Sequence, residues 1–66
     1  MMPKIGDIIK IKGWDNVGKI FGTNEYDEQI WFSCKVKFKA AIQIVDLCEE
    51  DIEEILTKEE YPEYYL

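Results

Sequence analysis

The sequence contains no histidine and no arginine, and only two cysteines and two prolines in 66 residues. Without histidine there is no ordinary base to activate a serine or cysteine nucleophile, which argues against an enzyme of that kind. Without arginine the chain lacks the side chain best suited to bidentate recognition of guanine or phosphate. The pI near 4.5 also argues against nucleic acid as a direct partner, because phosphate binding depends on cationic patches.

The few cysteines and the lack of long apolar runs set further limits. With no histidine, a zinc site at Cys34 and Cys48 would need carboxylates as its remaining ligands. The simpler interpretation is two reduced thiols that act as small hydrophobic side chains, with no metal or other cofactor. No run approaches the roughly 20 apolar residues that span a membrane. The opening Met-Met-Pro-Lys leads into a strand pattern without a stretch of signal-peptide length. We therefore expect a cytoplasmic protein that is not in a membrane.

Charge is divided along the chain. Seven of the eight lysines lie before residue 40, and nine of the fourteen acidic residues lie after residue 45. The lysines alternate with apolar residues in Ile9-Lys10-Ile11-Lys12 and again from Cys34 to Lys39, the period-two pattern of half-buried strands. The split predicts a basic β scaffold followed by an acidic end.

A chain of this length with 47% hydrophobic content makes one domain with a thin core. Alternation predicts strands at residues 7–12, 17–23, 30–39 and 42–47. Residues 13–16 have loop chemistry, and residues 24–28 are a polar hairpin connection. In the second strand, Gly18 and Gly22 share a face with Ile20, which indicates a bend or a close approach of backbones.

The third strand shows the clearest alternation. One set of side chains is expected to face the core and the other to face outward. The inward set is Ile30, Phe32, Cys34, Val36 and Phe38. The outward set is Trp31, Ser33, Lys35, Lys37 and Lys39.

The segment after residue 47 allows two interpretations. Its apolar residues have a helical spacing that would suit a helix from Glu49 to Glu60. The other interpretation is a single 3-10 turn at residues 48–51, followed by a short closing strand at residues 52–56. Residues 58–66 form an acidic, tyrosine-bearing tail, which is either disordered or packed back through its tyrosines and Leu66.

Short strands with a break before the last one are typical of an SH3-like barrel. The opening Lys4–Gly13, followed by Val17-Gly18-Lys19-Ile20, resembles the start of KOW-type barrels. The later part resembles the small barrels of the photosystem I subunit IV family, in which a Val-x-Phe strand (here Val36-Lys37-Phe38) precedes an acidic turn and closing strand (here Leu47–Ile55). The resemblance covers about residues 4–56 and implies an all-β, five-stranded SH3-like barrel over residues 1–57, with a 3-10 turn before the last strand. It is the reason why we favour the turn and closing strand over the helix. The acidic segment at 58–66 would then be a C-terminal tail. It implies a geometry but no activity.

Aromatic and basic residues are candidates for a binding surface. Trp14 in the first long loop and the outward-facing Trp31 are of the type that dominates interfaces, and Tyr26 is a third residue of this kind. Lys35 and Lys37, together with Lys10, Lys12 and Lys39, would form a cationic face beside Trp31 that could stack a base or grip an acidic peptide. Alternatively, these lysines protect strand edges from aggregation or pair with the chain's own acids.

The acidic candidates are Glu49, Glu50, Glu53 and Glu54. They could solubilise the protein, dock a basic partner or imitate the charge of nucleic acid. The function we favour is a non-enzymatic protein-binding module, an accessory subunit or adaptor. The first alternative is a small acidic inhibitor, of the type phages encode, that blocks a nucleic-acid-binding protein. The second is a KOW-like nucleic-acid binder.

Overall fold

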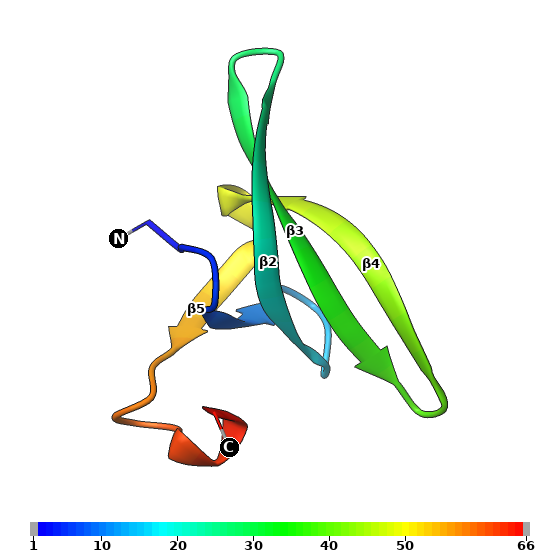
Figure 1. Ribbon diagram of the computed structural model, residues 1–66, viewed down its shortest axis with the longest axis vertical. Coiled ribbons are helices and arrows are strands. Elements are labelled where there is room, and N and C mark those ends of the chain that lie inside the picture. The colour runs from blue at the N-terminus through cyan, green and yellow to red at the C-terminus, as the bar shows by residue number, and fades with distance from the viewer. Residues whose placement is uncertain (1, 66) are drawn as a thin grey trace.

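The computed structural model describes residues 2–65, which form five strands and two short 3-10 helices. The strands pair antiparallel in one sheet with the order β4-β3-β2-β1-β5 (Figure 1). Their bounds are β1 (Ile8–Ile11), β2 (Val17–Tyr26), β3 (Gln29–Phe38), β4 (Ala41–Cys48) and β5 (Ile52–Leu56). The all-β prediction with five strands is confirmed. Over the described residues the pairing leaves the sheet open, with β4 and β5 as its two edges.

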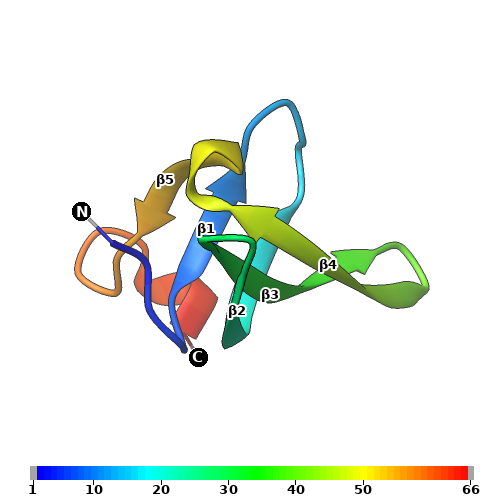
Figure 2. The same ribbon diagram turned by 90° about the horizontal axis from the view of Figure 1, so that it is seen from above.

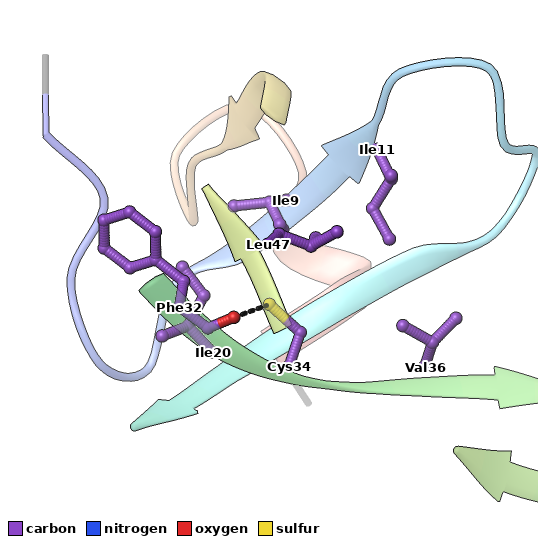
Figure 3. Packing of buried hydrophobic residues seen from close by; sticks show 7 residues of the cluster. All are labelled: Ile9, Ile11, Ile20, Phe32, Cys34, Val36 and Leu47. Atoms are coloured by element: carbon purple, nitrogen blue, oxygen red, sulfur yellow. Dashed lines mark hydrogen bonds between the residues drawn. The ribbon is translucent and has the colours of Figure 1, made fainter. Parts of the chain in front are cut away.

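The core is built from alternate residues of the first four strands. Along β3, the side chains of Phe32, Cys34 and Val36 are at most 1% exposed, because every second residue of a strand points to the same face. Side chains of β5 pack at the margin of this core. The buried cluster consists of Ile9, Ile11, Ile20, Phe32, Cys34, Val36 and Leu47 (Figure 3).

The hairpin of β2 and β3 is longer than predicted, and its tip projects beyond the rest of the sheet (Figure 1). Its turn is only Asp27 and Glu28, whose φ values of 55° and 62° are the left-handed ones that a type I′ turn requires. β1 pairs with β2 only as far as Lys19, and β4 pairs with β3 only from Trp31 onward, so the tip has no strand beside it. Ile30 lies on the same face of β3 as Phe32, but it is 37% exposed, and the prediction that it is part of the core is wrong.

Gly18 lies where β2 and β3 approach closely. A Cβ atom at this position would lie 3.3 Å from Val36 Cγ2 and 3.4 Å from Cys34 Cβ, tighter than ordinary van der Waals contact. The predicted close approach is confirmed at this glycine. Only a residue without a side chain fits here without displacing the core.

Gly22 lies beside a β-bulge. The register of β2 against β3 shifts between Ile20 and Gly22, which leaves Phe21 as an extra residue. A Cβ atom at Gly22 would meet only Ser33 Cβ, at 3.8 Å, which is an ordinary contact. The predicted bend is therefore a bulge that reverses the direction of the side chains after it. Because of this reversal Gly22 lies opposite Ser33, and the prediction that it shares a face with Ile20 is wrong.

The chain passes from β4 to β5 through the 3-10 helix η1 (Glu49–Asp51), as Figure 2 shows. Asp51 closes this turn, because its Oδ2 accepts hydrogen bonds from the backbone N–H of Cys48 at 3.2 Å and from the Cys48 thiol at 3.3 Å. β5 then pairs antiparallel with β1. The turn-plus-strand interpretation is confirmed, and the alternative helix from Glu49 to Glu60 is wrong.

The acidic tail folds back onto the sheet through the 3-10 helix η2 (Pro62–Tyr65). The hydroxyl of Tyr65 donates a hydrogen bond to the Leu56 carbonyl oxygen at 2.6 Å and accepts one from the Ile8 N–H at 3.2 Å. The tail is thus attached to both β1 and β5 by one side chain. Of the two interpretations of this segment, packing through tyrosine is the one that the structure has. Leu66, the other anchor we expected, lies outside the described residues.

Removing this anchor should weaken the fold. We expect Tyr65→Phe to lower the free energy of unfolding by about 1–2 kcal/mol, because the Leu56 carbonyl and the Ile8 N–H both lose their partner. Tyr64→Phe is the matched control, since the Tyr64 side chain is 43% exposed and should tolerate the change. Urea denaturation followed by circular dichroism measures both. Equal midpoints for the two variants would show that the tail contact does not stabilise the sheet.

Candidate protein-binding surface

Trp31 lies at a hollow on the outer face, by which we mean the face of β2, β3 and β4 opposite the core. It alternates with the buried Phe32, so the two side chains point to opposite faces of β3. On the neighbouring strands, Trp31 lies opposite Asn24 of β2 and Cys48 of β4. The Trp31 hollow has a volume of about 330 Å³ and is lined by Asn24, Tyr26, Trp31, Ser33 and Asp46. The structure therefore brings together two of the aromatic residues that the sequence suggested.

The carboxylate of Asp46 is held in place at this hollow. Ser33 Oγ donates a hydrogen bond to Asp46 Oδ1 at 2.9 Å, across the pairing of β3 with β4. On the neighbouring strand β2, Ser33 lies opposite Gly22, so no side chain from that position fills the Trp31 hollow. The result is a concave site with one wall that carries a fixed negative charge.

The hollow combines aromatic surface with polar groups. Tyr26 is 71% exposed, whereas the indole Nε1 of Trp31 is buried and has no hydrogen-bond partner between residues 2 and 65. A buried N–H donor without a hydrogen-bond partner lowers the stability of the folded protein. Natural proteins accept such a cost mainly at functional sites. Aromatic faces beside a carboxylate attract a cationic side chain. The hollow is therefore suited to a lysine or arginine of a partner.

Exposed isoleucines alternate with lysines along the rest of the outer face. Lys35 lies opposite Ile44, and Lys37 lies opposite Ile42. Both isoleucines are 65% exposed. The ammonium group of Lys35 lies 5.2 Å from the ring centroid of Phe21, a cation–π distance. We call these five residues the lysine–isoleucine strip: Phe21, Lys35, Lys37, Ile42 and Ile44.

The sequence pattern does not indicate three members of this strip: Phe21, Ile42 and Ile44. Phe21 is the bulged residue, and a bulge interrupts the alternation that would have indicated its face. On β4, Ile42 and Ile44 lie on one face and Val45 and Leu47 on the other, so the pattern of this strand alone does not show which face is buried. One available signal was Asp46, which shares the face of the two isoleucines and is expected to face solvent.

The five lysines expected on one face do not all lie together. Lys35 and Lys37 share the outer face of β3. Lys10 instead pairs with Glu53 of β5, with 3.1 Å between Nζ and Oε2. Such an exposed pair contributes about 0–1 kcal/mol. The remaining two lie in turns: Lys12 and Lys39.

Trp14 lies apart from the Trp31 hollow. Its ring packs against Phe38, with 5.8 Å between the centroids, and its side chain is 36% exposed. Phe38 follows Trp31 by seven residues on β3, a distance of about 23 Å at the rise of a strand. The two tryptophans therefore belong to different parts of the surface.

The acidic candidates gather around β5, at the edge of the sheet opposite β4. Glu49 and Glu50 lie in η1, Glu53 and Glu54 lie on β5, and all four are exposed. The charge of Glu54 raises the pKa of Tyr61, whose hydroxyl donates a hydrogen bond to Glu54 Oε2 at 3.4 Å. An open acidic hollow of about 380 Å³ is lined by Pro3, Glu49, Ile52, Glu53, Glu54, Ile55, Thr57 and Glu60.

The two cysteines are free and buried. Burial, with a smaller effect from the charge of Asp46, raises the pKa of the Cys34 thiol to about 11. This thiol is therefore protonated at neutral pH, and a protonated thiol is a poor nucleophile. Within residues 2–65 no three cysteine or carboxylate side chains are grouped so that they could hold a metal ion. The same residues contain no helix of the length and hydropathy that a membrane span needs.

Two surfaces are thus candidates for binding. One is the outer face, with the Trp31 hollow and the lysine–isoleucine strip, and the other is the acidic hollow beside β5. Comparison with protein-family models, with curated proteins and with solved structures finds no match to this chain.

Proposed function

We propose that this chain is a non-enzymatic protein-binding module, an accessory subunit or adaptor, whose partner docks on the outer face. One observation carries the proposal: Phe21, Ile42 and Ile44 are exposed on the same face as the Trp31 hollow. Small soluble domains seldom expose neighbouring apolar side chains unless they bind something there. Tryptophan is also among the residue types that are enriched at the hot spots of protein interfaces.

We also propose that the sheet is an SH3-like small barrel left open between β4 and β5. The strand order β4-β3-β2-β1-β5 and the 3-10 turn before the last strand support this assignment. Folds of this type carry many unrelated functions. The partner must therefore be inferred from the chemistry of the surface and not from the fold.

That chemistry favours an extended peptide segment with two charges of opposite sign. A lysine or arginine would enter the Trp31 hollow beside Asp46, and an acidic residue would face Lys35. Lys35 follows Trp31 by four residues, which is about 13 Å along a strand. An extended segment spans this distance in about four residues. The partner segment therefore has a basic and an acidic residue about four positions apart.

Site-specific photo-cross-linking tests the proposal. Tyr26 at the Trp31 hollow and Tyr61 beside Glu54 at the acidic hollow are each replaced by the photoreactive analogue benzoylphenylalanine. We expect a cross-linked protein in an extract of the source cells from position 26 and none from position 61. Adding Trp31→Ala to the position-26 protein should reduce the product about tenfold or more, the usual effect at a hot spot. Trp14→Ala, the matched control, should leave it unchanged.

The same experiment separates the second candidate function. Glu49, Glu53, Glu54 and Glu60 line one hollow, an arrangement that favours docking on a basic surface and imitation of nucleic-acid charge. In that case position 61 gives the cross-linked product, and added DNA or RNA abolishes it. Capture at position 61 alone, or a product at position 26 that survives Trp31→Ala, contradicts the outer-face proposal.

A further inference from the structure

β4 is an unprotected sheet edge. Its only strand partner between residues 2 and 65 is β3, so its other side presents unpaired backbone groups. The pairing with β3 runs without a bulge along all eight residues of β4. Ala41–Val45 contains no charge, proline or glycine. Natural proteins normally protect such an edge with a charge, a proline or a bulge, because an exposed edge invites another strand to pair.

The opposite edge shows the protection that β4 lacks. β5 has only five residues, two of which are Glu53 and Glu54. The tail also lies against it through the hydrogen bond of Tyr65 to Leu56. By contrast, Ile42 and Ile44 on β4 are each 65% exposed, and β4 lies at the margin of the molecule in Figure 1. The difference between the two edges indicates that β4 is the one available for pairing.

We propose that β4 pairs antiparallel with β4 of a second copy of this chain, so that two five-stranded sheets join into one continuous sheet. The charges around β4 favour a second copy of the chain as the partner, and they favour antiparallel pairing. The start of β4 follows Lys39 and lies beside Lys37, whereas its end carries Asp46 and leads into Glu49. A two-fold axis places the basic end of each copy beside the acidic end of the other. A parallel arrangement would place like charges together.

Symmetry limits the possible registers, and the contact between exposed isoleucines selects one of them. A two-fold axis perpendicular to the sheet keeps both outer faces on the same side, so a residue on one face pairs with one on the same face. With Gln43 paired with Gln43 of the second copy, Ile42 lies opposite Ile44 at both ends of the contact. Lys39 then lies opposite Leu47, next to Asp46 of the second copy. This register brings all four exposed isoleucines together and keeps the Trp31 hollow open.

Charge changes at Gln43 test both the pairing and its register. Gln43 is exposed and belongs neither to the Trp31 hollow nor to the lysine–isoleucine strip. The proposed docking function can therefore fail or succeed independently of this experiment. Sedimentation equilibrium of the wild type should give twice the chain mass of 7.8 kDa as the concentration rises. Gln43→Lys and Gln43→Glu should each dimerise up to about fivefold more weakly, because like charges lie directly opposite on the axis.

An equimolar mixture of the two variants is the decisive measurement. It should recover the dimer, because a lysine then lies opposite a glutamate. Ile5→Lys, at an apolar residue that is 60% exposed and away from β4, should dimerise like the wild type. Hydrogen exchange provides a second readout, since β4 amides should gain protection with protein concentration. A wild type that stays monomeric at every concentration, or a mixture no more associated than either variant alone, overturns the proposal.

Discussion

Phe32→Ala is expected to unfold most of the protein at room temperature. Phe32 is the largest side chain that is completely buried, with 1% exposure, and it contacts the cluster built from β1 to β4. Removing a buried phenylalanine costs about 3–5 kcal/mol, through lost burial and the cavity left behind. That cost is of the order of the whole stability of a domain of this size. Circular dichroism and urea denaturation would show a broad or absent transition.

The neighbouring residue is the natural control for this substitution. Trp31 lies on the opposite face of the same strand and is only partly buried, so Trp31→Ala should keep a cooperative unfolding transition. The two substitutions thus separate folding from binding within one dipeptide of β3. A folded Phe32→Ala protein, or an unfolded Trp31→Ala protein, would mean that the two faces of this strand are assigned the wrong way round.

Gly18→Val is expected to lower the free energy of unfolding by about 1–3 kcal/mol, the usual cost of overpacking a core. The first added carbon would already lie 3.3 Å from Val36 and 3.4 Å from Cys34, and valine adds two further methyl groups. In a domain of this size each kcal/mol lowers the melting temperature by about 4–8 °C. Thermal unfolding followed by circular dichroism measures the shift.

Gly22→Val is the matched control on the same strand. The nearest side-chain atom to an added Cβ there is Ser33 Cβ at 3.8 Å, so the new side chain has room. Valine also has a higher strand preference than glycine, and the variant should be as stable as the wild type or more stable. Equal losses at both positions would contradict the close approach of β2 and β3 at Gly18.

The faces of β3 could be predicted from the sequence because alternation is a local property. Successive side chains of a strand point to opposite sides, so the pattern from Trp31 to Lys37 separates core residues from surface residues without knowledge of the neighbours. The turn at Glu49–Asp51 and the strand after it were expected for a different reason, the resemblance of Leu47–Ile55 to the closing segment of small barrels. The apolar spacing of this segment alone also allowed a helix, because acidic residues suit the first turn of a helix as well as a turn between strands.

Other features depended on which strands lie beside each other. Ile30 has the same alternation as Phe32, yet it is exposed because neither β1 nor β4 reaches the hairpin tip. Lys10 has the same pattern as Lys35, yet it pairs with Glu53 because β5 lies next to β1. In both cases the sequence identifies the face of a strand but not what covers that face.

The sequence by itself determined the strand content, the two sides of β3 and the separation of basic and acidic halves. The tertiary structure decided that Trp31 and Tyr26 meet in one hollow while Trp14 lies elsewhere, and that the tail is held by Tyr65. It also decided that β4 remains an open edge. The physical reason is that side-chain direction follows from local backbone geometry, whereas burial and pairing depend on contacts between residues far apart in the chain.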